Sequence, residues 1–461
     1  MIPSNVIGTL SNIVGAGNLI ISQDKLEEYA TDGTKLRYVP DAVAFPGNGE
    51  EISRIFNLAN NEYFPIIPRG GGSGMSGGSL PVEGGLILAM DRLNRILLID
   101  TENLIAKVEP AVITARFQEE VEKVGLFYPP DPASADIATI GGNVAECAGG
   151  LRGLKYGVTR DYVLGLTVVL PNGEVINTGG ETLKGVAGYD LTRLIVGSEG
   201  TLAVITSITL RLIPKPAIKK TMIAFFTDLL SACRTVSRII REKIVPVTLE
   251  FLDRLSIDCV RENIVMDIPE GTVSMLLIEV DGDEPIVERD SERIEEICTE
   301  SGAIHYRIAL NPEEVEKIWE ARREVSPSLL KLRPNKVSED VVVPRSRVPD
   351  LVVFLERLAE KRGLPIPAFG HAGDGNIHVN IMIDEDNPEE VRKGEAAVRD
   401  LFRKVVELGG TITGEHGVGL TKAPYMEMEF SRPSLELMAK IKKAFDPRGI
   451  LNPGKIFIDR F

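Results

Sequence analysis

The clearest alternation of apolar and polar residues lies between Asn376 and Ile383. Successive side chains of a strand point to opposite faces, so a period of two predicts a strand with one apolar and one polar face. The two faces are Ile377, Val379, Ile381 and Ile383 on one side, and Asn376, His378, Asn380 and Met382 on the other. An imidazole beside two carboxamides on one strand face suits a functional site better than a core.

Before residue 216, short apolar runs and amphipathic stretches follow one another. Residues 1–40 are expected to form a short helical segment before the first strand. Helices are predicted at 50–61, with Asn48 or Gly49 near the N-cap, and at 114–124 and 190–196. Strands are predicted at 42–45, 63–68, 86–90, 95–100, 104–109, 163–170 and 174–178, and in the run that ends near Ile213.

From about residue 217, strands alternate with longer, charged helices. The strands are expected at 222–226, 273–280 and 304–309, and the helices at 228–242, 285–301, 313–332, 348–362, 388–408 and 433–445. This order predicts an α+β layer, with a mostly antiparallel sheet and helices on one face. Pro214 and Pro216 mark a boundary, so the predicted domains are 1–216, 217–410 and a C-terminal segment, 411–461.

A glycine-rich segment at residues 69–79, which we call the glycine loop, follows the predicted strand at 63–68. It presents many backbone N–H groups without Cβ atoms, which suits it to cradle a phosphate or pyrophosphate. Gly72, Gly74 and Gly77 match the Gly-x-Gly-x-x-Gly pattern, but a Rossmann fold needs a helix directly afterwards. Because Pro81 and a strand follow instead, we expect phosphate binding in a β-rich setting. The alternative is a flexible linker.

Three of the four histidines in the chain lie in glycine-rich surroundings. His371 is expected in a turn and His378 on the predicted strand, while His416 directly follows Glu415. Two imidazoles and a carboxylate are the ligands of an open divalent-metal site. The pattern favours such a site over the alternative of separate, hydrogen-bonded histidines in turns.

Composition limits the classes of partner. The 461 residues, 43% hydrophobic and 26% charged, describe an ordinary soluble protein of two or three domains. The net charge of −15 argues against nucleic acid or an anionic membrane, but leaves open a partner protein with a basic patch. The four cysteines are scattered, which excludes a built-in iron–sulfur cluster and fits a reducing compartment. No signal peptide or membrane span is found, so a cytoplasmic location is expected.

Several motifs occur together and in order, at 68–79, 139–145, 197–205, 369–380, 414–419 and 451–455. In this combination the chain resembles the FAD-linked D-2-hydroxy-acid dehydrogenases, a family that includes glycolate oxidase catalytic subunits and D-lactate dehydrogenases. They belong to the vanillyl-alcohol-oxidase/para-cresol-methylhydroxylase (PCMH) superfamily. The resemblance implies an α+β fold with a PCMH-type FAD-binding domain of two α+β subdomains, an antiparallel-sheet cap domain and a C-terminal tail that returns to the FAD domain.

The resemblance also implies the residues that bind FAD. In some relatives a histidine or a tyrosine of the FAD domain bonds covalently to the flavin. No histidine precedes His305, so histidyl attachment is excluded here, and non-covalent binding is expected. The pyrophosphate is expected to contact Arg69, Gly70, Gly71, Gly72, Ser73, Gly74 and Ser76. The flavin is expected to be lined by Pro130, Asp131, Thr139, Gly141, Gly142, Asn143, Gly149, Glu199, Gly200 and Ile205, with Asn452 closing the site from the tail.

For the metal, the resemblance implies the ligands His371, His378 and Glu415, with His416 as the base. Zinc, iron or manganese all suit two nitrogens and one oxygen. A metal chelated by the substrate lowers the pKa of its hydroxyl group, and a neutral histidine can then accept the proton near pH 7.

For the substrate carboxylate, the resemblance implies an arginine in a Trp-x-x-Arg pattern. Trp319 and Arg322 match this pattern, and Arg323 is an adjacent rival. Some relatives carry a substrate lysine where this chain has Ser338. Lys336 lies two positions earlier, and its role is left open.

The implied function is FAD-dependent oxidation of a small D-2-hydroxy acid, D-lactate or glycolate, to the 2-oxo acid, with hydride transfer to flavin N5. The electrons pass to an external acceptor, for which an electron-transferring flavoprotein or an iron–sulfur subunit is favoured. The alternatives are net non-oxidative chemistry of the ether-lipid synthase type and a silent flavin-binding subunit. Attachment to the membrane periphery through a partner and a homodimer also stay open.

Overall fold

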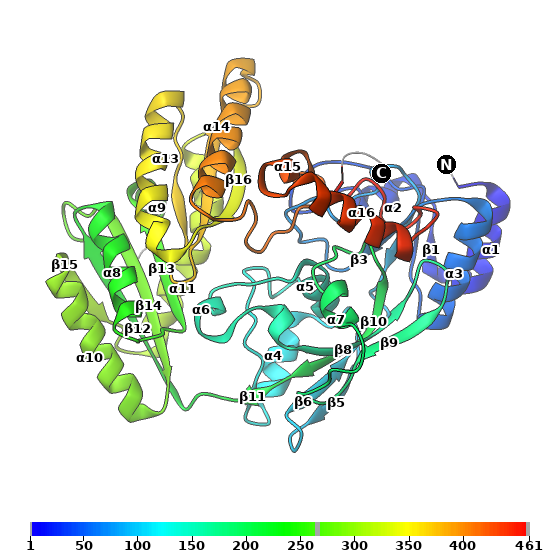
Figure 1. Cartoon of the computed structure of the whole chain (residues 1–461), viewed down its shortest axis with the longest axis horizontal. Coiled ribbons are helices and arrows are strands. Elements are labelled where there is room, and N and C mark those ends of the chain that lie inside the picture. Colours follow the sequence, from blue (N-terminus) through cyan, green and yellow to red (C-terminus); the bar gives the residue numbers. More distant parts are fainter. Residues whose placement is uncertain (1, 263–267, 458–461) are drawn as a thin grey trace. The chain divides into compact units, whose positions relative to one another are not determined.

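The computed structural model describes residues 2–262 and 268–457 and divides into two compact units. The first unit comprises Met1–Gly149, Val158–Lys215 and Glu415–Phe461, and the second comprises Gly150–Gly157 and Pro216–Gly414. Each unit therefore combines segments that lie far apart in the sequence. Figure 1 labels many of the helices and strands of both units.

The first unit contains two main sheets. In the four-stranded sheet β1-β2-β4-β3, the strands β2 (Ala42–Ala44), β4 (Leu86–Ala89) and β3 (Ile66–Arg69) run parallel, and β1 (Leu19–Ile20) is antiparallel to β2. The five-stranded sheet pairs antiparallel neighbours in the order β5 (Ile96–Asp100), β6 (Ile105–Val108), β10 (Val204–Arg211), β8 (Val163–Val169) and β9 (Val175–Gly179). A two-stranded ribbon pairs β7 (Leu126–Phe127) with β11 (Ile213–Pro214).

Helix α3 (Gly49–Glu62) shows how local sequence produces these elements. The Asn48 side chain accepts a hydrogen bond from the Glu51 N–H (2.9 Å), and the Glu51 carboxylate accepts one from the Gly47 N–H (2.7 Å). Such reciprocal contacts satisfy donors that the start of a helix leaves unpaired. Its buried side chains recur at helical spacing: Ile52, Ile55, Phe56 and Ala59. The helix predicted at 50–61 is confirmed.

The remaining α-helices of the first unit are short apart from two. They are α1 (Ser4–Val14), α2 (Gln23–Leu26), α4 (Thr114–Glu122), α5 (Ile140–Glu146), α7 (Leu191–Ile195), α15 (Met426–Glu429) and α16 (Arg432–Phe445). Buried side chains of α1, α3 and the four-stranded sheet form one hydrophobic cluster, which also contains Ile450 and Leu451 from the C-terminal segment. The tail is therefore part of the core of this unit.

The second unit is built on a seven-stranded sheet, β15-β12-β14-β13-β17-β18-β16, in which all neighbouring strands are antiparallel. Its strands are β12 (Ile218–Phe226), β13 (Thr248–Asp253), β14 (Ser274–Gly282), β15 (Ala303–Ile308), β16 (Asn335–Val342), β17 (Ala368–His371) and β18 (Asn376–Ile383). The predicted antiparallel sheet is confirmed. His371 ends a strand rather than lying in a turn as expected, because β17 pairs with both β13 and β18.

Helices cover both faces of this sheet, so the prediction of helices on one face is wrong. One group, α8 (Leu229–Arg241), α10 (Glu284–Glu300), α13 (Val348–Arg362) and α14 (Pro388–Glu407), packs along the sheet (Figure 1). A separate cluster buries α9 (Arg254–Val260), α11 (Pro312–Arg323) and α12 (Val325–Ser328) against sheet residues such as Leu252 and Met275. Strand β14 is buried at successive positions, so both of its faces require apolar cover. The small helix α6 (Gly153–Tyr156) also belongs to this unit.

The helix predicted at 313–332 is broken into α11, α12 and a 3₁₀ turn at Leu329–Lys331. Pro327 lies inside the predicted span, and a proline has no N–H to continue an α-helical ladder. The start of α11 follows local chemistry, since the Asn311 side chain accepts from the Glu314 N–H at 2.9 Å.

The helices are amphipathic rather than wholly apolar. Helix α14 spans 20 residues, and its buried residues, among them Ala397, Leu401 and Val405, recur every three or four positions between charged ones. Across residues 2–262 and 268–457, no helix combines the length and the apolar character needed to span a membrane.

Replacing Phe251 by alanine tests the packing of the sheet. Phe251 is fully buried in β13, on the face opposite Glu250 and Leu252. Truncating a buried phenylalanine costs about 3–5 kcal/mol, so Phe251→Ala should lower the midpoint of thermal unfolding by several degrees in calorimetry. Leu310→Ala is the control, because Leu310 is 81% exposed and its loss should have little effect. Equal midpoints for the two variants would contradict the burial of Phe251 on this face of β13.

Candidate functional site

Arg69 ends strand β3 and braces the glycine loop. Its buried guanidinium donates to the Thr31 carbonyl (2.7 Å), and more weakly to the Tyr29 carbonyl (3.5 Å) and the Ser79 hydroxyl (3.4 Å). The same group lies 5.8 Å from the centre of the Tyr29 ring. The expected phosphate-binding arginine is thus committed in part to shaping the loop.

The glycine loop offers donors that the protein does not use. Among the described residues, no backbone N–H from residues 71–79 donates to a protein acceptor. The buried Ser76 hydroxyl also finds no partner there. Gly72 has a left-handed backbone (φ +67°), and a Cβ at Gly71 would collide with the Ile137 carbonyl. A row of unused N–H groups in a tight glycine turn fits a phosphate-bearing group.

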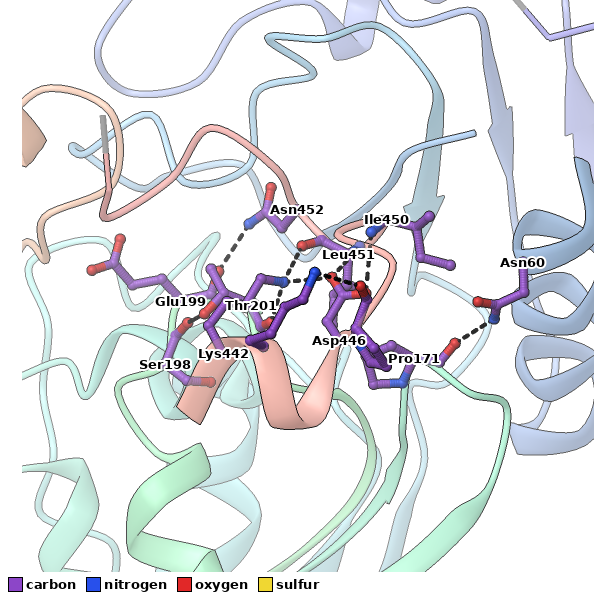
Figure 2. Close-up of polar contacts among 12 residues, drawn as sticks. Asn60, Pro171, Ser198, Glu199, Thr201, Lys442, Asp446, Ile450, Leu451 and Asn452 are labelled. Carbon is purple, nitrogen blue, oxygen red and sulfur yellow. Dashed lines mark hydrogen bonds and ion pairs between the residues drawn. The ribbon is translucent and has the colours of Figure 1, made fainter. Parts of the chain in front are cut away.

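Three other segments of the first unit converge on this loop. The buried Glu199 carboxylate accepts hydrogen bonds from the Val418 N–H (2.8 Å) and the Gly419 N–H (2.6 Å). The Leu420 N–H donates to the Ser76 carbonyl at 2.7 Å. The Asn452 amide donates to the carbonyls of Gly78 and Glu199, both at 2.9 Å. Figure 2 shows the contact between Asn452 and Glu199.

Glu199 also has a raised pKa. Burial raises it, and the hydrogen bonds from Val418 and Gly419 oppose the rise. Its backbone is left-handed, with φ +53°, which is uncommon for a residue with a side chain. This conformation turns residues 197–200 back toward α5, where the Gly197 N–H donates to the Val144 carbonyl and the Glu199 N–H to the Ala145 carbonyl.

Helix α5 carries several of the residues expected to line the flavin. Thr139 caps it, accepting from the Gly142 N–H at 3.2 Å, and the Asn143 amide donates to the Thr114 hydroxyl at 2.7 Å. The N–H groups of Ile140 and Gly141 donate to the carbonyls of Val112 and Pro110. The first N–H groups of α5 are therefore already hydrogen-bonded within the protein. This segment can line a flavin, but these N–H groups are not available to bind it.

The other expected flavin residues lie around these segments. Gly200 packs against the Pro68 ring, and Ile205 is buried in β10. The Pro130 carbonyl accepts from the Gln118 amide at 2.8 Å, and Asp131 follows it. Gly149 lies against Glu415, whose Oε2 would be 2.9 Å from a Cβ at that position.

In the second unit, β17 and β18 bring His371 and His378 together. Their ring centres are 5.2 Å apart, and the rings meet edge to face. His371 is buried, His378 is partly buried, and Phe369 lies directly opposite His378 in the strand pairing. The polar face predicted for β18 exists but is itself buried, since Asn376 and Asn380 are at most 5% exposed.

Glu250 on β13 links His371 to Arg322. One carboxylate oxygen of the fully buried Glu250 lies 2.5 Å from His371 Nδ1, and the other accepts from Arg322 Nε (2.8 Å) and Nη2 (2.5 Å). Burial raises the pKa of Glu250, but His371 and Arg322 outweigh that effect and hold it at about 2. A carboxylate that accepts from Nδ1–H fixes the tautomer in which Nε2 has a free lone pair, which is the form that binds metals.

Glu415 lies one peptide bond beyond Gly414, the last residue of the second unit. The Gly414 N–H donates to the Asp340 carboxylate at 2.8 Å, and Asp340 is paired with His378 across β16 and β18. One ligand atom from each of His371, His378 and Glu415 lies within 4.8 Å of the others, which fits a divalent metal with an open position. His416, the next residue, is partly buried.

The two rival arginines differ in environment. The Arg322 side chain is 10% exposed and lies 4.7 Å over the Phe369 ring, whereas the Arg323 side chain is 52% exposed and pairs with exposed Glu316. Only Arg322 therefore contacts the histidine-bearing network within the described structure.

The polar residues on β16 bond to neighbouring side chains and backbone. Lys336 Nζ donates to the Ser326 carbonyl at 2.8 Å, and the Ser338 hydroxyl donates to the Asn380 carbonyl oxygen at 2.6 Å. The buried Asn380 amide nitrogen finds no acceptor among the described residues. It offers a donor on the same strand face as His378.

The sequence did not single out Glu250 or Asp340. The available signal was an acidic residue inside an otherwise apolar strand, as in Thr-Leu-Glu-Phe-Leu at 248–252. A lone acidic residue in such a run needs a partner, but the run does not show which residue provides it.

Two family models match the chain. One, described as "FAD binding domain", matches residues 40–179, and the other, "FAD linked oxidases, C-terminal domain", matches residues 215–456. The chain is 49% identical to the glycolate oxidase subunit GlcD of Bacillus subtilis, covering 96% of this chain and 93% of that protein. It is 34% identical to a D-lactate dehydrogenase of Anaerostipes hadrus, covering 90% and 89% respectively.

Solved structures resemble the chain in fold. p-Cresol methylhydroxylase with bound substrate matches with a TM-score of 0.81 at 20% identity, over 99% of this chain and 96% of the other. Alkyldihydroxyacetonephosphate synthase matches with a TM-score of 0.74 at 19% identity, over 98% and 86%. The predicted α+β, PCMH-type flavoprotein fold is confirmed.

Replacing Glu250 by glutamine tests the ion pair beneath the histidines. Glu250→Gln leaves the Arg322 guanidinium buried without its counter-charge, which typically costs about 3–5 kcal/mol. Chemical denaturation should show a loss of unfolding free energy of that order. Arg323→Gln is the matched control, and at its exposed position the change should stay below about 0.5 kcal/mol.

The double variant Glu250→Gln/Arg322→Gln separates this charge effect from a change of packing. It should recover part of the lost stability, because no unpaired charge remains. If the double variant is no more stable than Glu250→Gln, the ion pair is not the cause.

Proposed function

The chain belongs to the FAD-linked oxidases, and from this premise we propose that it oxidises a small D-2-hydroxy acid, such as glycolate or D-lactate, to the 2-oxo acid. One observation carries the proposal, namely the grouping of His371, His378 and Glu415 next to the Glu250–Arg322 pair. Relatives named glycolate oxidase subunit and D-lactate dehydrogenase support the substrate class.

The glycine loop and its neighbours would hold FAD. The unused N–H groups of residues 71–79 and the buried Ser76 hydroxyl suit the pyrophosphate, and Thr139 to Asn143 would line the flavin. When bound, FAD supplies a two-electron acceptor for the carbon-bound hydrogen. Binding is non-covalent in this proposal, and histidyl attachment within the FAD domain is excluded because His305 is the first histidine of the chain.

His371, His378 and Glu415 would hold a divalent metal, and zinc, iron and manganese all suit this donor set. When bound, the metal supplies a Lewis acid that lowers the pKa of the substrate hydroxyl. Glu250 orients His371 for this role by accepting from its Nδ1 side.

His416 and Arg322 would act on the substrate. His416 accepts the hydroxyl proton as the general base. Arg322 uses Nε and Nη2 on Glu250, so the Nη1 side of its guanidinium can bind the substrate carboxylate. The bonds to Glu250 fix the conformation of the Arg322 side chain, which limits the orientations that a bound hydroxy acid can adopt.

Anaerobic mixing tests the reaction. D-lactate or glycolate should bleach the flavin absorbance of the wild-type protein in stopped-flow measurements. A synthase of the ether-lipid type or a silent subunit would leave the flavin absorbance unchanged.

Two variants test the metal and the base. His378→Ala should lose metal and bleaching together while retaining FAD. His416→Ala should keep FAD, but its flavin should bleach at least ~100-fold more slowly.

His305→Ala is the matched control, because His305 is exposed on β15 and lies outside this site. It should keep FAD, metal and bleaching. Active protein without stoichiometric metal in elemental analysis would refute the metal role, whatever the substrate.

The electrons are proposed to leave through a partner protein, an electron-transferring flavoprotein or an iron–sulfur subunit. The Bacillus subtilis relative is itself named a subunit, which supports a multi-component enzyme. The net charge of −15 would suit a basic docking face on the partner, with a binding affinity that falls as the salt concentration rises.

Turnover of the isolated chain should be fast with an artificial dye and slow with oxygen or NAD. Hydrogen peroxide formed in equal amount to oxidised substrate would overturn the partner proposal.

A further inference from the structure

Lys442 lies in the last turn of α16 and joins three parts of the first unit. Its ammonium donates to the Thr201 carbonyl (2.8 Å), the Asp446 carboxylate (2.6 Å) and the Leu451 carbonyl (2.7 Å), as Figure 2 shows. An ammonium has three protons, so all of its donors are used. Thr201 belongs to the turn that contains Glu199 and Gly200, and Leu451 belongs to the C-terminal segment.

Asp446 completes this arrangement and is 2% exposed. Its two carboxylate oxygens accept from the Ile450 N–H (3.1 Å) and the Leu451 N–H (2.8 Å). These bonds close the turn between α16 and the final segment (Figure 2). The buried carboxylate and Lys442 neutralise each other, so removal of either leaves a buried charge and two unpaired backbone groups.

After the closed turn, the final segment lies beside the start of β3, the strand that leads into the glycine loop. The Ile66 N–H donates to the Ile450 carbonyl and the Asn452 N–H to the Ile66 carbonyl, each at 2.8 Å, at the start of β3. Beyond this point the Asn452 amide bonds Gly78, and Lys455 Nζ donates to the Leu80 carbonyl at 2.6 Å. The tail thus contacts the strand that enters the glycine loop and the residues that leave it.

We propose that Lys442 and Asp446 are positioning residues for FAD, which hold the glycine loop and the 197–201 turn in their binding arrangement through the C-terminal tail. The proposal rests on FAD binding at these loops, not on the identity of the hydroxy acid. Loops that are already ordered lose less conformational freedom when they bind a ligand. A tail that is less firmly held should therefore lower the affinity for FAD. By reciprocity, FAD stabilises the docked tail by the same factor.

The test compares Lys442→Met with Lys443→Met. Methionine keeps the apolar stem of Lys442 and removes the ammonium. Lys443 is the matched control, because it is the adjacent, exposed lysine and, within the part of the chain that the structure describes, its Nζ donates only to the Pro447 carbonyl. Titration of FAD-stripped protein with FAD, followed by flavin fluorescence, should show affinity roughly 5- to 150-fold weaker for Lys442→Met and within about twofold of wild type for Lys443→Met.

A second measurement needs no variant. Amide hydrogen exchange at residues 446–456 of wild-type protein should slow when FAD is bound, whereas strands β12 and β14 of the second unit serve as an internal reference. Unchanged exchange at 446–456, or a folded Lys442→Met protein that binds FAD as wild type does, would overturn the proposal. Neither result depends on substrate oxidation, so a failure of the proposed reaction would be seen separately in the bleaching experiment.

Discussion

Carboxylates removed from water organise both units, because an ionised carboxylate is stable in a protein interior only when donors surround it. Glu250 is matched by Arg322 and His371, and Asp446 by Lys442. Glu199 is matched by two backbone N–H groups. In each case the carboxylate joins segments that would otherwise be independent. Any rearrangement that separated the partners would leave a buried charge unpaired or, for Glu199, a buried carboxyl group and two N–H groups without hydrogen bonds, which favours one arrangement of these loops.

The groups that the fold leaves unsatisfied are as informative as those it satisfies. The first N–H groups of helix α5 donate to the carbonyls of Val112 and Pro110 and to its own cap, Thr139. By contrast, the glycine loop, the Ser76 hydroxyl and the Asn380 amide nitrogen find no acceptor among the described residues. Buried polar groups are rarely left unpaired without a functional reason. The Ser76 hydroxyl and the Asn380 amide nitrogen, together with the N–H groups of the glycine loop, are therefore donors that remain available to a ligand.

Sequence patterns succeeded where one local rule decided the structure. The period of two at 376–383 produced β18, and the Asn48 cap with its helical spacing produced α3. A strand rather than a helix follows the glycine loop, as Pro81 indicated. One error came where distant contacts decided. His371 was expected in a turn but pairs in a sheet. A second error was local: the helix expected at 313–332 is interrupted after Arg323, because Pro327 lacks the N–H that would bond the Arg323 carbonyl.

By itself, the sequence determined many of the strands and the longer helices, and the chemical character of the site. It showed a loop rich in N–H donors, histidines in glycine-rich surroundings and a polar strand face, because each of these depends on residues close together in the chain. Only the tertiary structure decided which partners meet. Glu250 lies 72 residues from Arg322 and 121 from His371, and its apolar strand gave no sign of either. Long-range pairing depends on how strands and helices pack, and burial then makes such pairs obligatory, since an unpaired charge in the interior is too costly to keep.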